Sequence, residues 1–465
     1  MLIKSKYIHE CNIEDKKIIL IHTLTFVYFI IKDSDYNNWI SENFQEMDQD
    51  NVAQLIDMKF LIKNYDEDVK ILKLAQEYFS TPQLMIPNIV IYITNECNLR
   101  CSYCFTGYEH NKEYETISLV DVDKIFDAII YIYSNNKFLN GGPIISLFGG
   151  EPLLVKNKYI IEYIFKRLSN ISINSLEIVS NIVNIKYFAD VIKEYKKTVY
   201  VRVTLNGEKD VHDNLRKSNN DMGTYEISIK NMKYMLEKVD NIVFELLILL
   251  DINGANLNGI EKMFNDLENN NLLNNKRVDI KFGKIQFRGD YVCLNYKNQV
   301  LDVEDYYPKL LEFKRKIPYI KENMLSGSSM YKFIEMYKFW KYNTMITPSF
   351  KGCDAVYPGR FCFFTDGYIY PCFDCVGMNN FRIGEYRNKL KFNDNFLAWN
   401  SFNTKNIIKC NNCKYVGFCN GGCLITNQSK NNDIYDVHCE NVEQSLNKFI
   451  IELDKEEFFD ERNMH

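Results

Sequence analysis

Residues 96–105 read ECNLRCSYCF and directly follow an apolar, strand-like segment, residues 89–94. They place Cys97, Cys101 and Cys104 in a C-x3-C-x2-C spacing. Three thiolates can hold three irons of a [4Fe–4S] cluster, whereas a cluster that is structural or only carries electrons is normally closed by four cysteines. The spacing therefore predicts a cluster whose fourth iron is open to a substrate or a cofactor.

Outward from this stretch, apolar strand patterns alternate with helical patterns. Strands are expected at residues 89–94, 143–149, 176–181, 199–206, 242–250 and 279–287, and helices at 120–133, 158–168, 185–196, 225–237, 260–267 and 305–316. Six such units predict a parallel sheet, and the uniformly apolar strands predict that both of its faces are buried. The simplest closure is a partial (β/α)6 TIM-like barrel, an α/β fold with the cysteine triplet at its C-terminal face.

The regions on either side of the barrel have different patterns. Residues 1–85 predict a small α+β domain, 86–320 the barrel and 321–345 a bridging segment. Residues 346–465 are rich in Gly, Asn and Cys and end in a helical pattern. Regular periodicity fades there, as expected where metal clusters replace a large apolar core.

Composition narrows the class of protein. The chain has 465 residues, a net charge of −5 and scattered Lys and Arg, which argues against a nucleic-acid partner. No apolar run reaches the roughly 18–20 residues of a membrane span, and residues 1–10 do not resemble a signal peptide. A cytoplasmic location is expected. Of the 14 cysteines, Cys11 and Cys293 stand alone and the rest are clustered, which in a reducing compartment indicates metal ligands rather than disulfides.

The triplet resembles the signature of radical S-adenosylmethionine (SAM) enzymes, in which an aromatic residue, here Tyr103, precedes the last cysteine. Gly149, Gly150 and Glu151 match the family's GGE motif; the glycines would let backbone approach the ligand, and the carboxylate would accept from the SAM ammonium. The resemblance implies that the open iron binds SAM, which is cleaved to methionine and a 5′-deoxyadenosyl radical.

A second stretch extends the resemblance. Thr204-Leu205-Asn206-Gly207, followed by HDNLR at residues 212–216, is similar to the S-x-D-G…HDxxR pattern of one branch of the family. Carried over by position, Thr204 and Arg216 become SAM contacts. Asn206 replaces the usual Asp, and Ser180-Asn181-Ile182 stands where T-N-G is common, so the ribose and adenine contacts are not assigned.

Simpler interpretations exist for these motifs. Three cysteines at this spacing could be half of a zinc site, although no nearby fourth ligand completes one. An isolated G-G-E is usually a loop, and Arg216 could make a structural ion pair. The position of these motifs along the predicted barrel favours the radical SAM interpretation.

The later cysteines resemble the seven-cysteine SPASM pattern of radical SAM enzymes that modify peptides and proteins. The resemblance implies two auxiliary [4Fe–4S] clusters, three clusters in all. The distal one would be held by Cys410, Cys413, Cys419 and Cys439, and the nearer one by Cys353, Cys372 and Cys423. A pair of all-cysteine zinc sites is the alternative.

The fourth ligand of the nearer cluster is left open by the sequence. Asp366-Gly367 is a two-residue turn signal, and the hairpin that it predicts pairs Cys362 with Pro371 and Phe361 with Cys372. On that register Cys362 points away from Cys372 and is a core cysteine. Cys375 is the other candidate. The third possibility is an open iron that binds a thiolate of the substrate.

Asp374 lies two residues after Cys372. Relatives that oxidise a residue of sulfatases place their catalytic Asp directly after the matching cysteine. Asp374 is therefore a candidate proton acceptor, and a solvated or hydrogen-bonding Asp is the alternative.

Residues 1–85 resemble, more loosely, the winged-helix-like leader-recognition domain of many maturases of ribosomally made peptides. Such a domain would bind a leader peptide as an added strand at its sheet edge. A structural extension that caps the barrel is the alternative.

Together these features predict a radical SAM/SPASM maturase that abstracts a hydrogen from a precursor peptide with a leader. A cysteine thioether is the preferred product and a C–C crosslink the second. A sulfatase-maturating-type oxidase and a non-catalytic iron–sulfur module are the alternatives. The expected partners are the precursor peptide and an electron donor such as flavodoxin or ferredoxin, without nucleic acid or membrane.

Overall fold

The largest element of the molecule is a ten-stranded mixed sheet with the order β11-β10-β9-β8-β7-β6-β12-β13-β14-β15. Strands β6 to β11 are parallel, and each pairs with the next along the chain. The predicted partial barrel of six parallel strands is confirmed. The computed structural model describes residues 2–13, 16–32, 34–79, 86–104, 114–134, 142–285, 294–326, 331–356 and 359–460.

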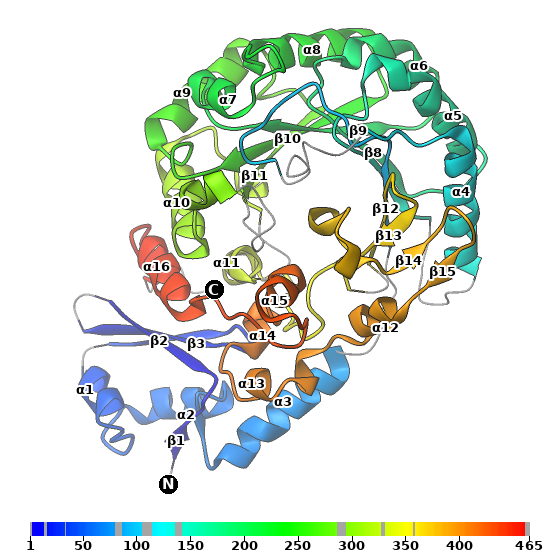
Figure 1. Cartoon of the computed structure of the whole chain (residues 1–465). Coiled ribbons are helices and arrows are strands. Elements are labelled where there is room, and N and C mark those ends of the chain that lie inside the picture. Colours follow the sequence, from blue (N-terminus) through cyan, green and yellow to red (C-terminus); the bar gives the residue numbers. More distant parts are fainter. Residues whose placement is uncertain are drawn as a thin grey trace.

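Each predicted barrel strand is present to within a few residues. The strands are β6 (Asn88–Tyr92), β7 (Ile144–Phe148), β8 (Ser175–Val179), β9 (Val199–Leu205), β10 (Ile242–Leu250) and β11 (Val278–Lys284). Figure 1 shows the helices that connect these strands along the outside of the sheet. They are α4 (Leu119–Ser134), α5 (Lys158–Leu168), α6 (Ala189–Glu194), α7 (Lys209–Leu215), α8 (Tyr225–Lys238), α9 (Leu257–Asn269) and α10 (Val303–Lys316), with short 3-10 turns at Val155–Asn157, Ile185–Phe188 and Leu294–Gln299.

The prediction that both faces of this sheet are buried is wrong for the inner face. Along β10, buried and half-buried residues alternate from Ile242 to Leu250. Side chains on a strand alternate between its two faces. The outer face packs against the helices, whereas the inner face lines a cavity inside the barrel, with Thr204 and Leu247 among its lining residues.

The cysteine-rich region continues the barrel sheet. Strand β12 (Arg360–Phe363) pairs in parallel with β6, and β13 (Tyr368–Tyr370), β14 (Gly384–Glu385) and β15 (Lys391–Phe392) follow in antiparallel order. The helices that begin after Asp394 lie beneath the barrel opening in Figure 1. The remaining elements of residues 321–460 are α11 (Phe333–Tyr342), α12 (Asp394–Ser401), α13 (Ile408–Asn411), α14 (Val416–Cys419), α15 (Leu424–Asn431) and α16 (Val442–Asp454), with 3-10 turns at Glu322–Met324, Phe373–Cys375, Asn379–Phe381 and Thr404–Asn406.

The predicted register of the β12–β13 hairpin is wrong by one residue. Cys362 pairs with Tyr370, not with Pro371. The backbone N–H of Phe364 donates to the carbonyl of Tyr368 at 3.0 Å, so the loop has three residues, and its last residue, Gly367, has a φ of +90°. A one-residue shift changes the face on which side chains lie.

The N-terminal unit is small and mixed, as predicted. Strands β2 (Ile8–Ile13), β3 (Lys17–His22) and β4 (Tyr28–Ile31) form an antiparallel sheet, and β1 (Ile3–Lys4) pairs with β5 (Leu61–Ile62). Its helices are α1 (Ser34–Ile40), α2 (Gln49–Asp57) and α3 (Tyr65–Phe79). Trp39 and Phe60 are fully buried in a core of its own.

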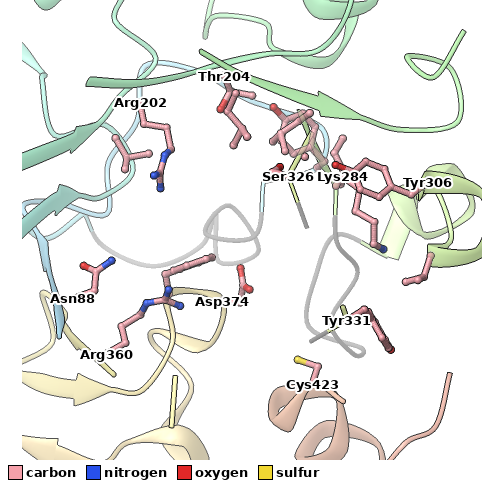
Figure 2. A pocket seen from close by; sticks show the side chains of 18 of the residues that line it. Asn88, Arg202, Thr204, Lys284, Tyr306, Ser326, Tyr331, Arg360, Asp374 and Cys423 are labelled. Atoms are coloured by element: carbon pink, nitrogen blue, oxygen red, sulfur yellow. The ribbon is translucent and has the colours of Figure 1, made fainter. Parts of the chain in front are cut away.

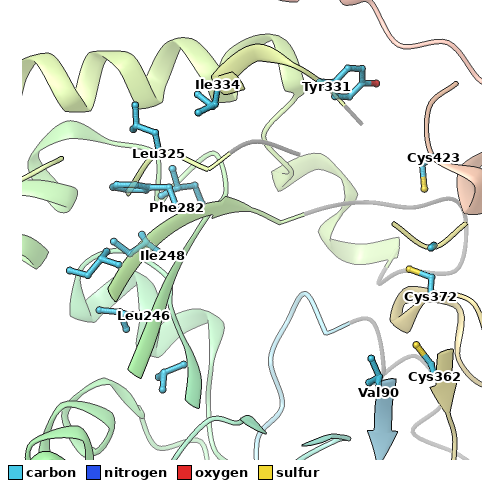
Figure 3. Close-up of a cluster of buried hydrophobic side chains, with 14 of the residues drawn as sticks. Val90, Leu246, Ile248, Phe282, Leu325, Tyr331, Ile334, Cys362, Cys372 and Cys423 are labelled. Atoms are coloured by element: carbon cyan, nitrogen blue, oxygen red, sulfur yellow. The ribbon is translucent and has the colours of Figure 1, made fainter. Parts of the chain in front are cut away.

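A second, larger core joins the three regions. It contains Tyr7 and Ile19 from the N-terminal sheet, Leu246 from the barrel and Phe449 from α16. Figure 3 shows part of it, in which Val90 of β6 lies close to Cys362 of β12. Among the described residues, no helix combines the length and apolar content that crossing a membrane requires.

Candidate active site

The cysteine triplet lies in the loop after β6 and is held by the segment that follows α7. The N–H of Arg100 donates to the carbonyl of Lys217 at 2.8 Å, and that of Ser102 to the carbonyl of Leu215 at 3.0 Å. All three cysteines are half-buried. Burial, then Glu151 and the other two thiols, raise the pKa of Cys97, which shows that the thiols lie close together. A compact set of three thiols at the end of a barrel strand fits a cluster with three protein ligands.

The glycines of the GGE motif approach the protein's own backbone. A Cβ at Gly149 would stand 2.5 Å from the carbonyl oxygen of Thr94, and a Cβ at Gly150 would stand 2.3 Å from that of Glu96. The N–H groups of Gly150 and Glu151 donate to these same carbonyls, each at 2.8 Å. The motif therefore fixes the segment that leads into Cys97, and the expected close approach of the glycines to a ligand stays a prediction.

Glu151 joins three loops and is almost completely buried. Its carboxylate accepts from the N–H of Leu153 at 2.8 Å, the hydroxyl of Ser180 at 2.7 Å and the N–H of Asn181 at 2.8 Å. Burial raises its pKa, although these hydrogen bonds act in the opposite direction. Asn181 in turn donates to Asn98 Oδ1 at 2.8 Å, within the cysteine loop. Glu151 thus acts on the protein's own loops, whereas its expected contact with an ammonium group stays a prediction.

Tyr103 links the triplet to two other predicted residues. Arg216 Nη1 donates to the Tyr103 hydroxyl at 2.8 Å, and that hydroxyl donates to Asn206 Oδ1 at 2.8 Å. Burial opposes the charge of Arg216, but Cys101 and Tyr103 raise its pKa above the ordinary value. Asn206 also donates from Nδ2 to the carbonyl of Leu249 at 3.1 Å, which an Asp could not do. The departure from the usual Asp therefore has a local structural role.

The residues before Arg216 hold its segment against α8. Asp213 Oδ1 accepts from the N–H groups of Thr224 and Tyr225, both at 2.8 Å, at the start of that helix. Thr224 then donates from its hydroxyl to the carbonyl of Arg216 at 2.8 Å. The HDNLR stretch thus positions Arg216 beside the cysteine loop.

A cavity of about 380 Å³ runs from the triplet to the cysteine-rich region. Tyr103 and Thr204 line it at the barrel end, and Asp374 and Cys423 line it at the other (Figure 2). Its volume lies within the range of small-molecule and side-chain sites, about 300–1,000 Å³. The cavity could enclose the reacting part of a larger substrate.

Of the cysteines assigned to the nearer auxiliary site, Cys423 lines this cavity. Cys372 and Cys423 are buried, and Cys353 is half-buried. Cys375 is buried beside them: its pKa is raised first by burial and then by Cys372 and Cys362. Figure 3 shows Cys362, Cys372 and Cys423 in one region. The expectation that Cys362 points away from Cys372 is therefore wrong. The pairing of β12 with β6 puts Cys362 on the face of Val90, which lines the cavity, and the three-residue hairpin loop puts Cys372 on that same face.

Asp374 also lines the cavity, and Cys372 Sγ lies 3.9 Å from its Oδ2. The carboxylate is therefore within reach of a group held between the triplet and Cys423. This placement is compatible with a proton acceptor.

The four cysteines assigned to the distal site influence one another. Burial, then Cys413 and Cys439, raise the pKa of Cys410 to about 11. Burial is also the largest cause for Cys419, whose pKa is raised to about 12 with contributions from the other three thiols. The four thiols therefore interact electrostatically, and their assignment to one cluster stays a prediction. Among the described residues, no three or more His, Cys, Asp or Glu side chains converge as ligands of a single metal ion.

Several residues of the cavity were not anticipated from the sequence. Arg202 of β9, Lys284 of β11 and Arg360 of β12 point toward the cavity in Figure 2. At the triplet end, Tyr296 packs against Tyr103 with ring centroids 6.0 Å apart and donates to Asp251. Alternation along the strands could have revealed Arg202, since Arg202 and Thr204 share a face. Tyr296 has no such signal, because it lies in the short 3-10 turn Leu294–Gln299.

The chain is similar to known proteins both in sequence and in fold. Residues 91–267 match the model of the radical SAM superfamily. The cysteine-type anaerobic sulfatase-maturating enzyme of Clostridium novyi (strain NT) is 25% identical over 391 residues, 77% of this chain and 94% of that protein. The structure of native anSMEcpe with bound AdoMet has a TM-score of 0.57 at 18% identity and covers 81% of this chain and 100% of that chain.

A third similarity extends over nearly the whole chain. Streptococcus suis SuiB bound to precursor peptide SuiA has a TM-score of 0.53 at 15% identity and covers 93% of this chain and 97% of that chain. At these identities the solved structures establish the fold. The family model and the sequence relative, with the cysteine triplet at the end of β6, lead to one conclusion: residues 91–267 match the radical SAM superfamily, and the chain is related in sequence to an anaerobic sulfatase-maturating enzyme and similar in fold to SuiB.

Proposed function

We propose that this enzyme is a maturase that removes hydrogen from a ribosomally made precursor peptide and installs a cysteine thioether. Its superfamily implies SAM and a [4Fe–4S] cluster, which together supply a 5′-deoxyadenosyl radical that abstracts a hydrogen atom. The observation that carries the proposal is the cavity of about 380 Å³ between Tyr103 and Cys423. A peptide side chain in this cavity would lie between the triplet and the nearer auxiliary cysteines.

At the triplet end, we assign Cys97, Cys101 and Cys104 as the cluster ligands. Arg216 is suited to pair with the carboxylate of SAM, because its guanidinium is held beside the triplet by Tyr103. Thr204 lines the cavity and is assigned to the same cofactor. Gly149, Gly150 and Glu151 would act through the backbone that they hold.

At the other end, we assign the cysteine-rich region two auxiliary [4Fe–4S] clusters. The nearer one would be held by Cys353, Cys372 and Cys423, and the distal one by Cys410, Cys413, Cys419 and Cys439, whose thiols interact electrostatically. A substrate thiolate would complete the nearer cluster. Cys362, which lies on the same face as Cys372, competes with it for that position.

The protein's own task is to hold the target C–H bond near the radical and to exclude water. The inner face of β10 contributes Leu247 and Leu249 to an apolar part of the cavity. Asp374 is placed to accept the proton that the substrate thiol loses.

The N-terminal unit is proposed to bind the leader of the precursor peptide. Strand β4 is at one edge of the β2-β3-β4 sheet and, among the described strands, pairs with β3 alone. An extended leader could add to this edge through main-chain hydrogen bonds. The electron donor would be a flavodoxin or a ferredoxin. The protein would be located in the cytoplasm.

The proposal is tested by reconstituting the protein with iron, sulfide, SAM and a reductant, together with the peptide encoded by a neighbouring short reading frame. We expect 5′-deoxyadenosine and a peptide that has lost two hydrogens, with one cysteine no longer open to alkylation. An unchanged mass, or loss of two hydrogens with every cysteine still alkylated, contradicts the thioether. The latter result would indicate a C–C crosslink.

A sulfatase-maturating oxidase is the second candidate, and the sequence similarity to the Clostridium novyi enzyme favours it. A peptide that carries a sulfatase cysteine motif without a leader separates the two, because only the oxidase would convert it. A protein that forms no 5′-deoxyadenosine with either peptide would be an iron–sulfur module without this activity.

A further inference from the structure

Arg360 begins β12 at the boundary between the barrel and the cysteine-rich region. It pairs in register with Asn88 of β6, which lines the cavity. The observed hairpin register pairs Cys362 with Tyr370, and the same register extended by two residues sets Arg360 opposite Cys372. Directly opposed residues on paired strands lie on the same face of the sheet. The three-residue loop thus puts Cys372 on the same face of the sheet as Arg360.

The contacts of Arg360 connect two parts of that site. Its Nη1 donates to Cys372 Sγ at 3.9 Å, and its Nη2 forms an ion pair with Asp354, the residue after Cys353. The guanidinium also stacks on Phe373, 4.7 Å from the ring centroid. One cation therefore contacts the segments of two assigned ligands, Cys353 and Cys372.

The guanidinium is more buried than its carboxylate partner. The Arg360 side chain is 11% exposed, whereas that of Asp354 is 53% exposed. The buried Nε atom has no hydrogen-bond partner among the described residues. Water therefore screens Asp354 far more than Arg360, and a positive charge remains at the cavity wall.

Arg202, on β9, also lines the cavity but has a different environment. It donates to Glu245, and its Nη2 lies 3.9 Å from Glu177. Two carboxylates therefore balance this cation, and neither adjoins an assigned cysteine ligand. Arg202 provides a matched comparison with Arg360.

We propose that Arg360 is a positioning residue of the nearer auxiliary cluster, which raises the reduction potential of that cluster by donating to Cys372 and by placing positive charge on its cavity side. The inference rests on the proposed function, in which this cluster exists. Hydrogen bonds to ligand sulfurs and local charge are two of the factors that set the potential of an iron–sulfur cluster. A cation stabilises the reduced cluster more than the oxidised one, because the reduced form carries one more negative charge.

The effect would serve the oxidation step of crosslinking. When the carbon radical of the substrate joins the substrate thiol, a C–S bond forms, the thiol loses a proton, and one electron must leave. The nearer [4Fe–4S] cluster takes up that electron and is reduced. Arg360 makes this transfer more favourable.

The test is a redox titration followed by electron paramagnetic resonance in the full-length chain with Cys97, Cys101 and Cys104 replaced by Ala. Only the auxiliary clusters then contribute signals. We expect Arg360→Gln to disfavour reduction of one auxiliary cluster at least tenfold, about 59 mV for one electron, with iron content unchanged. Arg360→Lys should retain most of the wild-type potential, and Arg202→Gln should leave it unchanged.

Two results would overturn the inference. One is a wild-type potential in Arg360→Gln at full iron content. The other is loss of iron from both Arg360→Gln and Arg360→Lys, which would indicate a purely structural residue. If the parent protein lacks the iron of two auxiliary clusters, the proposed function itself fails, and iron analysis reports this separately.

Discussion

Single residues around the triplet act largely through the protein's own backbone. Gly149 and Gly150 allow the loop after β7 to lie against residues 94–96, and Glu151 ties that loop to Ser180. The cysteine loop is therefore held from two sides, by the GGE backbone and by the segment after α7. Its geometry is set before any cofactor binds.

Gly150→Ala tests this role. A Cβ at this position would stand 2.3 Å from the carbonyl oxygen of Glu96 and 2.5 Å from its carbon, so backbone must move. We expect a stability loss of about 1–3 kcal/mol and at least tenfold slower formation of 5′-deoxyadenosine. Denaturant unfolding and product chromatography measure the two effects. Normal product formation at normal stability would show that the loops can separate without consequence.

At the scale of elements, the β12–β13 hairpin decides which side chains meet the nearer auxiliary site. Its three-residue loop ends at Gly367, whose positive φ suits glycine. The pairing of β12 with β6 turns Arg360 and Cys362 toward the cavity, and the three-residue loop puts Cys372 on the same face. A two-residue loop would put Cys372 on the opposite face from Arg360 and Cys362.

Cys362→Ala tests whether the protein or the substrate completes the nearer cluster. If a substrate thiolate is the fourth ligand, iron content and thioether formation should both persist in this variant. Cys372→Ala is the matched control and should lose about four irons per chain. Equal iron loss in the two variants would mean that Cys362 closes the cluster, which contradicts the proposed substrate ligation.

At the scale of the whole molecule, the N-terminal sheet sits on the loop that carries the distal cysteines. Thr23 donates to the carbonyl of Lys414, and His9 Nδ1 lies 2.9 Å from the hydroxyl of Tyr415. Phe26 packs against Phe418 with ring centroids 6.4 Å apart. The proposed leader domain and the distal site therefore share an interface.

This interface should weaken in acid. Burial, then Lys414, lowers the pKa of His9 to about 3, compared with about 6.5 for an exposed histidine. Because the folded pKa is below the unfolded one, the stabilisation is complete above about pH 6.5 and is lost as pH falls toward 3. We expect protection of β2 and β3 amides to fall by up to about 1.4 kcal/mol per pH unit in that window. Hydrogen exchange measures the slope, which should be smaller in His9→Gln; equal slopes would exclude His9 as the cause.

Much of the architecture could be predicted from local sequence. The six parallel strands and most of the barrel helices lie where apolar periodicity places them, because that periodicity reflects burial against one neighbouring layer. The triplet must lie near the end of β6, because only a few residues of chain separate it from the strand. The assignment of the four distal cysteines to one cluster stays a prediction.

Other features depend on contacts between segments that are far apart in the chain. The approach of Gly150 to Glu96, the bond of Asn206 to Tyr103, and the junction of β12 with β6 join residues separated by tens to hundreds of positions. Local propensity carries no information about such pairs.

The sequence by itself determined the strand order of the barrel and the ligand types available, since both follow from short-range periodicity and spacing. Only the tertiary structure decided which faces those ligands share. Side chains alternate with a period of two along a strand, so the pairing of β12 with β6 puts Arg360 and Cys362 on the cavity face, and one extra loop residue puts Cys372 there with them. A dipeptide turn signal cannot report the pairing with β6, because that pairing joins segments far apart in the chain.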